Sequence, residues 1–157
     1  MNKRTAVLVT GSRDWLNYDP VRDRLRRYPV GTVLIHGNCG KVEYANGFEG
    51  VVEYRGADKI AHDIGQDMGF ICWPLPYFSD LGTRGGPKRN ECMFDVLLAL
   101  RLAGHACFVE GFPIGESKGT RGCLRIAERY NDQCERDGRH NERVAIHVTE
   151  GSLYVAP

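Results

Sequence analysis

The chain alternates between short apolar runs and longer segments in which apolar residues recur every three or four positions. The short runs are typical of strands buried on both faces of a parallel sheet, and the longer segments are typical of amphipathic helices. Strands are predicted at 5–11, 32–37, 70–75, 105–112 and 142–149, and helices at 19–28, 56–69, 89–104 and 120–138. This alternation predicts an α/β fold, with a parallel sheet covered by helices on both faces.

Local signals mark the ends of the predicted helices. Asp19 is placed to cap the first helix, with Pro20 at its first position, where a missing N–H group is harmless. Gly69 and Gly104 predict the ends of the second and third helices, since glycine readily takes the left-handed conformation found there. The third helix carries a Leu-rich stretch at 93–102, which predicts either core burial or the contact surface of a homodimer.

The regular alternation is interrupted at 38–55. Asn46 and Gly47 lie there between residues of high strand propensity, which predicts a small β-hairpin inserted between the second strand and the second helix. Since the insertion is too small for a domain of its own, we expect 1–157 to form one domain. The stretch 152–156 is a candidate for an additional edge strand.

Composition narrows the class of protein. The chain has 157 residues, of which 42% are hydrophobic and 26% are charged, as in a globular domain. A formal net charge of +1 argues against broad binding to nucleic acid or to an anionic membrane. No apolar run approaches the roughly 20 residues that span a bilayer. We therefore expect no membrane segment, and any recognition of anions has to be local.

The six cysteines favour free thiols over disulfides. No signal peptide precedes the first apolar run and no two cysteines form a CxxC pair, so we expect reduced thiols in a cytoplasmic protein. His36 and Cys39 have the spacing of half a zinc site, but no second pair completes it. We expect no metal.

Two loops carry the strongest functional signal. In an open parallel sheet, ligands bind beyond the carboxyl ends of the strands, where the strand order reverses. We expect the order 3-2-1-4-5, counted along the chain, which puts that point between the first and fourth strands. The loops leaving these strands, 10–15 and 111–120, are both rich in glycine, hydroxyl and basic residues. We expect them to share one anion-binding pocket.

The second of these loops includes "GESKGT" at 115–120, which has the ingredients of a phosphate loop in an order that differs from the Walker A motif. Glycine lets the main chain approach a ligand, and free N–H groups at a helix start attract an anion. The residues expected at the ligand are Gly115, Ser117, Lys118, Gly119 and Thr120. Taken alone, the loop has an alternative interpretation as a solvated turn with a capping hydroxyl.

A third segment, 85–93, adds basic and amide side chains at the predicted start of the third helix. Lys88 and Arg89 are both candidates for the ligand site, and Arg89 suits a phosphate or carboxylate because its guanidinium can form two parallel hydrogen bonds with either group. Asn90 is suited to an amide or hydroxyl. The alternative is a solvated helix start with Asn90 as its cap.

Four segments, in order, carry a resemblance to a known superfamily: "VTGSRDW" at 9–15, "HG" at 36–37 with "GADKIA" at 56–61, "GPKRN" with Met93 at 86–93, and "KGT" at 118–120. On these motifs the chain resembles the SLOG superfamily, and within it the DUF2493 or YspA-like (cpYpsA-related) branch. The resemblance implies a Rossmann-like fold that binds a nucleotide or nucleotide-derived ligand. Such domains occur in bacterial and phage conflict or signalling systems.

The resemblance also implies roles for individual residues. Trp15 is expected either to stack on a base or to fill the core. Asp58 suits ribose hydroxyls, or else it caps its own helix. The other residues implied at the ligand are Gly11, Ser12, Arg13, Gly37, Arg89, Asn90, Gly119 and Thr120.

More distantly, the chain is similar to the LOG-type phosphoribohydrolases, which release a base from a nucleoside monophosphate. Their "PGGxGTxxE" segment supplies a glutamate beside the scissile N-glycosidic bond, whereas Gly122 and Cys123 occupy the acidic positions here. Because cleavage needs a carboxylate, the catalytic candidates are Glu116 and Asp58, together with Arg89.

Three hypotheses follow from these residues. The first is a sensor or sequestering module that holds a nucleotide derivative, such as NAD, ADP-ribose or a nucleoside phosphate, without chemistry. The second is an N-glycosidic hydrolase acting on nucleoside monophosphates. The third is binding of single-stranded nucleic acid, which the net charge disfavours. Its basic crest would consist of Arg13, Lys88, Arg89, Lys118 and Arg121.

Overall fold

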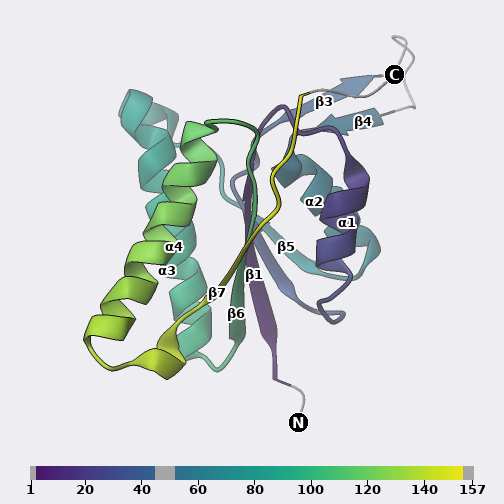
Figure 1. Cartoon of the computed structure of the whole chain (residues 1–157). Helices are drawn as coiled ribbons and strands as arrows, with labels where there is room; N and C mark the ends of the chain where they lie inside the picture. The colour runs from purple at the N-terminus through teal and green to yellow at the C-terminus, as the bar shows by residue number, and fades with distance from the viewer. Residues whose placement is uncertain (1–2, 45–51, 154–157) are drawn as a thin grey trace.

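A five-stranded sheet forms the middle layer of the molecule. In the computed structural model, which describes residues 3–44 and 52–153, its strands are β1 (Thr5–Gly11), β2 (Val33–His36), β5 (Ile71–Pro74), β6 (Ala106–Phe112) and β7 (Ala145–Val148). They lie in the order β5-β2-β1-β6-β7, with every neighbouring pair parallel (Figure 1). Counted along the chain, this is the predicted order 3-2-1-4-5.

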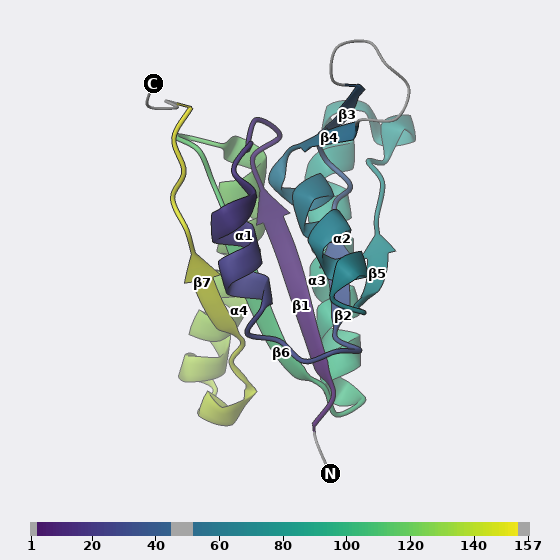
Figure 2. The same cartoon turned by 90° about the vertical axis from the view of Figure 1, so that its right-hand side faces the viewer.

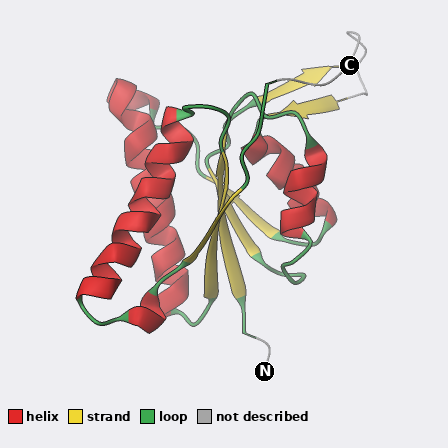
Figure 3. Cartoon of the chain, viewed as in Figure 1, coloured by secondary structure: helices red, strands yellow, loops and turns green. Residues whose placement is uncertain are grey.

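Helices cover both faces of the sheet, which gives a Rossmann-like three-layer α/β fold (Figure 3). One face carries α1 (Tyr18–Leu25) and α2 (Ala57–Asp67), and the other carries α3 (Gly85–Leu102) and α4 (Lys118–Arg136). The side chains of β1 alternate between the layers, with Ala6 and Leu8 in the core under α3 and α4 and Val7 and Val9 in the core under α1 and α2. Burial on both sides explains why the central strands are apolar throughout.

The Leu-rich stretch of α3 contributes mainly to the core. Met93, Phe94 and Leu97 are buried, and Leu98 and Leu100 pack against the same cluster while partly exposed. Leu102, at the end of the helix, is 91% exposed. Core packing therefore accounts for most of this face, and a homodimer through it stays a prediction.

All four helices begin at residues other than predicted, and for α2 the difference is one residue, Ala57 instead of Gly56. The cap of α1 is Asn17 rather than Asp19, because the Asn17 side-chain oxygen accepts a hydrogen bond from the N–H group of Asp19 (3.0 Å). Helix α3 starts at Gly85, directly after the 3₁₀ segment η2 (Ser79–Arg84). Its first turn tolerates Pro87, because N–H groups at this position have no acceptor within the helix. Helix α4 starts two residues early, at Lys118.

The predicted hairpin forms a separate two-stranded sheet. Its strands, β3 (Lys41–Tyr44) and β4 (Val52–Arg55), pair antiparallel, and the turn predicted at Asn46 and Gly47 lies outside the described residues. Figure 2 shows the hairpin beyond the carboxyl ends of the central strands, near the start of α2.

Of the additional strand predicted at 152–156, only the first two residues are described. Gly151, just before it, forms a parallel bridge with Ile114. All six cysteines are unpaired. Among the described helices, none has the length and apolar character needed to cross a bilayer.

Candidate ligand-binding cleft

A cleft of about 820 Å³ opens at the carboxyl edge of the sheet, where the strand order reverses between β1 and β6. Six segments line it: residues 10–14 at the end of β1, Cys39 after β2, Asp58 at the start of α2, Tyr77 and Thr83 before α3, the first turns of α3, and α4 from its start to Arg129. The loops around Ser12 and Gly119 therefore face the same cavity. Its volume lies within the range of small-molecule sites in proteins.

The loop after β1 forms the first wall, and main-chain hydrogen bonds hold it in place. The N–H group of Ser12 donates to Phe112 at the end of β6 (2.9 Å), while the Ser12 carbonyl accepts from Ala57 at the start of α2 (3.0 Å). Gly11 is required by packing, because a Cβ atom there would collide with the Ala57 side chain. The loop thereby presents Ser12 and the exposed Arg13 to the cleft. Arg13 pairs with no carboxylate in the part of the chain that the structure describes.

The N-terminal end of α4 forms the second wall. Ser117 precedes the helix in a left-handed conformation (φ 32°), and no side chain of a described residue caps the first turn. The Ser117 hydroxyl donates instead to the Thr120 hydroxyl (3.0 Å). The first N–H groups of a helix have no acceptor within it, and the helix dipole adds partial positive charge there. Together with Lys118, which also lines the cleft, this helix end suits an anion.

The first turns of α3 form the third wall, which contains a buried arginine. Arg89 is 7% exposed and donates through Nη1 to the Gly37 carbonyl (2.5 Å) and through Nη2 to Sγ of Cys39 (3.4 Å). Asn90 does not cap the helix as the alternative interpretation had it, because α3 already begins at Gly85 and Asn90, which is buried, lies in its second turn. It donates through Nδ2 to the Gly119 carbonyl (3.2 Å) and so links α3 to α4.

Asp58, in the first turn of α2, brings a buried carboxyl group to the cleft. Its Oδ2 atom accepts a hydrogen bond from the N–H group of Cys39 (3.1 Å), and its buried Oδ1 atom has no partner among the described residues. Burial raises the pKa of Asp58 to about 6, although the Cys39 N–H group and the Arg89 charge act in the opposite direction. No side chain caps α2 within the described chain, so the interpretation of Asp58 as a helix cap is wrong.

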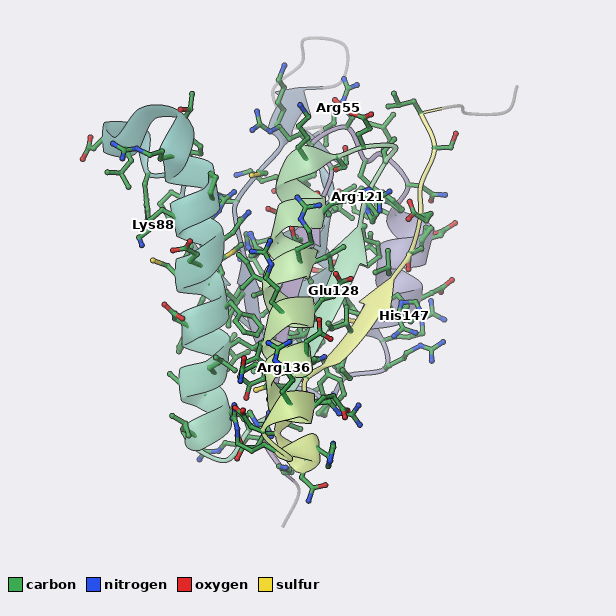
Figure 4. The ribbon with its side chains drawn as sticks, turned by 60° about the vertical axis from the view of Figure 1, so that its left-hand side comes forward. Arg55, Lys88, Arg121, Glu128, Arg136 and His147 are labelled. Atoms are coloured by element: carbon green, nitrogen blue, oxygen red, sulfur yellow. The ribbon has the colours of Figure 1, made fainter. Side chains whose placement is uncertain are left out.

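Three predicted ligand residues lie outside the lining of the cleft. Lys88 projects from α3 away from α4 (Figure 4) and pairs with Glu91 (3.0 Å), since successive helical residues point about 100° apart and Arg89 takes the inward position. Gly115 is exposed, and its carbonyl accepts from Nε of Arg121 (2.9 Å). Gly37 lies against the Arg89 guanidinium and borders a neighbouring hollow.

Trp15 and Glu116 are also absent from the lining that the described residues form. Trp15 is 3% exposed, packs edge-on against Phe112 (5.4 Å between ring centres) and donates through Nε1 to the Asn17 carbonyl (2.7 Å). Because the core takes this ring, the predicted stacking on a base is wrong. Glu116 is exposed in the turn before α4, so Asp58 is the carboxylate candidate that remains in the cleft.

The basic crest predicted for nucleic acid does not form one free surface. Arg121 pairs with Glu150 (3.0 Å) on the outer side of α4, and Lys88 pairs with its own helix neighbour. Arg89 is buried and bonded to the protein. Of the five predicted cations, Arg13 and Lys118 are the ones that both line the cleft and form no ion pair with a described residue.

Among the lining residues that sequence reasoning did not predict at the ligand, three bear on ligand binding. Tyr77, 44% exposed, follows β5 and offers an aromatic surface, and its hydroxyl donates to the Gly82 carbonyl. Arg125 and Arg129 enter from α4. Their spacing of four residues was a usable signal, because it places both on one helical face.

The fold and the cleft define a Rossmann-like α/β protein with a cavity at its topological switch point. No family model matches the chain, and no solved structure matches it. The Gene 61 protein of Mycobacterium phage D29 is 33% identical to it over 133 residues, which cover 78% of this chain and 88% of that protein. The chain belongs to the family of this phage protein. Since the relative's name states no ligand or reaction, function has to be argued from the cleft.

Proposed function

We propose that this protein binds a nucleotide or nucleotide-derived ligand in the cleft, as a sensing or sequestering module. The observation that carries the proposal is the convergence of the Ser12 loop and the α4 N-terminus on one cavity. A phosphate group at this point meets main-chain N–H groups and the helix dipole, with Arg13 and Lys118 beside it. The proposal includes membership in the SLOG superfamily. The resemblance of the sequence motifs to that superfamily implies the same class of ligand.

The remaining walls suit the other parts of a nucleotide. Tyr77 offers an exposed ring to a base, in the role that the buried Trp15 does not fill. The Oδ1 atom of Asp58, which accepts no hydrogen bond from any described residue, suits a hydrogen-bond donor, and ribose hydroxyls are donors. A buried acceptor without a partner is unfavourable, so a ligand hydroxyl at Asp58 gains more than the same contact would gain in water.

Two glycines of α4 support a ligand at the helix start. A Cβ atom at Gly119 would meet nothing within 4 Å, and one at Gly122 would meet only the Arg125 guanidinium at 3.9 Å. Neither glycine has a positive φ. Each glycine costs a helix about 1 kcal/mol relative to alanine. Because neither packing nor backbone conformation requires these glycines, we attribute them to the room that a ligand needs.

Isothermal titration calorimetry against NAD, ADP-ribose, cyclic nucleotides and purine nucleoside monophosphates tests the proposal. We expect at least one of them to bind, and Gly119→Asp to abolish that binding by placing a negative charge against the phosphate. Gly119→Asn, which has the same size without the charge, should retain more affinity. The acidic variant is expected to fold, since acidic residues are favourable near a helix N-terminus. Absence of binding to the folded protein, or equal effects of the two variants, would show the proposal to be wrong.

The cleft also favours one alternative, in which the protein hydrolyses the N-glycosidic bond of a nucleoside monophosphate. The observation behind it is Asp58, a buried carboxyl group in the cleft with its pKa raised to about 6. Such a group is suited to proton transfer or to stabilising a positively charged sugar. Liquid chromatography of AMP or ADP-ribose incubated with the protein tests this alternative. Release of a base that Asp58→Asn abolishes would support hydrolysis, and an unchanged nucleotide would leave binding alone.

A further inference from the structure

The cleft continues beyond the first turn of α4 into the groove between α3 and α4. These two helices lie side by side on the same face of the sheet (Figures 1 and 4). Glu91 lines the groove from α3, and Arg125, Ile126 and Arg129 line it from α4. The cavity is thus longer than its opening at the sheet edge, and its extension carries basic side chains.

Arg125 and Arg129 differ from the other arginines of α4 in their lack of a partner within residues 3–44 and 52–153. Both are exposed, and neither forms an ion pair or side-chain hydrogen bond with a residue that the structure describes. Arg121 pairs with Glu150 (3.0 Å), and Arg136 donates to Gln133 (2.8 Å). The two guanidinium groups that line the groove are therefore available to a ligand.

The acidic side chain in the same groove does not cancel these charges. Glu91 is held by Lys88 at 3.0 Å, and this pair lies on the α3 side. Arg125 and Arg129 are one helical turn apart on α4, so their charges act on the same short stretch of the groove. Ile126 and Met93 contribute apolar surface to the lining, on which the sugar or base of an extended ligand has room to pack.

Helix geometry sets the separation between this basic pair and the phosphate position at the start of α4. With a rise of 1.5 Å per residue, the Cα atoms of Arg125 and Arg129 lie about 9 Å and about 15 Å along the axis from that of Gly119. Helical side chains lean toward the N-terminus, and the Arg125 guanidinium reaches back to Gly122, within 3.9 Å of where a Cβ atom would lie. Adjacent phosphates of one diphosphate are too close together to occupy both positions.

We propose that the ligand is of dinucleotide length and carries two separated phosphate groups, one at the α4 N-terminus and one between Arg125 and Arg129. The inference rests on the proposed nucleotide binding and specifies the size and charge of the ligand. A mononucleotide fills the opening alone and leaves the basic pair without a partner. A linear dinucleotide with a 5′-phosphate reaches both positions, because a nucleoside separates its two phosphates.

The test compares the affinities for two probes. The four nucleoside 5′-monophosphates are titrated first. The second probe is the linear 5′-phosphorylated dinucleotide that contains the base of the tightest-binding monophosphate. We expect the wild type to bind the dinucleotide about tenfold more tightly at low salt. The double variant Arg125→Ala/Arg129→Ala should lose about that factor for the dinucleotide and less than about twofold for the mononucleotide.

A matched control separates the groove from general charge effects. Arg22→Ala/Arg26→Ala removes two exposed arginines with the same four-residue spacing, one from α1 and one from its C-cap, on the other face of the sheet. This control variant should bind the mononucleotide and the dinucleotide as tightly as the wild type does. Circular dichroism should show that both double variants are folded.

The outcomes are distinguishable. Equal affinity for the two probes, with no effect of Arg125→Ala/Arg129→Ala, would overturn the dinucleotide inference and leave the proposed function intact. Failure of every probe to bind would overturn the proposed function itself. A hexanucleotide that binds more than about tenfold better than the dinucleotide would instead indicate a strand-binding surface, and it too would overturn the inference.

Discussion

Glu110 and Asp58 are both buried carboxylates, yet the protein supplies them with very different numbers of partners. Arg24 donates to Glu110 through Nε (3.0 Å) and Nη2 (2.9 Å), and the Tyr28 hydroxyl donates at 2.5 Å. His147, labelled in Figure 4, lies 3.5 Å from the same carboxylate. Asp58 has one main-chain donor on Oδ2, and its buried Oδ1 atom has no partner among the described residues. The difference separates a carboxylate that holds the fold together from one whose hydrogen-bonding capacity is not used up.

Glu110→Ala should have the largest effect on stability. The substitution leaves the Arg24 guanidinium, whose side chain is 18% exposed, without its partner, and removal of one member of a buried pair costs about 3–5 kcal/mol. We expect the free energy of unfolding in urea to fall by about that amount, while the folded fraction keeps its nucleotide affinity. Glu128→Ala, on the exposed surface of α4 (Figure 4), is the control and should change stability by less than about 0.5 kcal/mol. A similarly small loss for Glu110→Ala would contradict the structural role.

Asp58→Asn should change the pH dependence of stability. Burial raises the pKa of Asp58 to about 6, so the folded protein keeps this proton to a higher pH than the unfolded chain does. Well below pH 4 both states are protonated and the group has no effect. Stability then falls as the pH rises to about 6, and above that the ionised carboxylate lowers it by about 3 kcal/mol. Part of this loss has already occurred at pH 4, and the asparagine does not titrate, so stability of the variant relative to the wild type should rise by about 2 kcal/mol between pH 4 and pH 7.

Urea unfolding of both proteins at the two pH values measures this difference. Asp19→Asn is the control, because Asp19 is an exposed carboxylate whose side chain is 79% accessible. If the change with pH in the Asp58→Asn difference is no larger than the change in the Asp19→Asn difference, the carboxyl group is not destabilised by burial and the contrast with Glu110 fails.

The same contrast shows what the sequence predicts well. The strand order and the meeting of the two loops follow from local patterns, because parallel strands that alternate with helices have few ways to connect. The inward orientation of Arg89 depends on the Gly37 carbonyl, 52 residues away in the sequence. Nothing local distinguishes Arg89 from Lys88, and for this reason both were predicted at the ligand.

Trp15 and Tyr77 show a second limit of sequence reasoning. Both aromatic rings follow strands near the cleft, but Phe112 packs against Trp15, whereas Tyr77 stays 44% exposed. The choice between them depends on how the ends of β1 and β6 pack. Likewise, the sequence predicts correctly that Glu116 belongs to the loop before α4. Only the path of that loop in the structure shows that Glu116 lies outside the cleft lining.

Two glycines extend the comparison from carboxylates to the main chain. A side chain at Gly11 collides with Ala57, so Gly11→Ala should destabilise the protein by about 1–3 kcal/mol. Gly119→Ala should stabilise α4 by about 0.5–1 kcal/mol, since nothing stands near the new methyl group, and should weaken nucleotide binding. Thermal melts and titration calorimetry on both variants measure the two effects. An unchanged affinity in Gly119→Ala would remove the ligand as the reason for glycine at this position.

The smallest expected effect is a difference in nucleotide affinity between substitutions of two lysines, one near the start of α3 and one at the start of α4. Lys88 is paired with Glu91 outside the cleft, while Lys118 lines the cleft and has no ion pair among the described residues. An exposed charge near a bound phosphate contributes about 0.2–1 kcal/mol, so Lys118→Met should weaken nucleotide binding about threefold at low salt. Lys88→Met should leave the affinity unchanged. Since salt screens exposed charges, the threefold difference should largely disappear at 0.5 M salt. The screening length there is about one third of its low-salt value. Calorimetry at both salt concentrations measures it, and equal losses in the two variants would mean that the ligand senses overall charge rather than the α4 helix start.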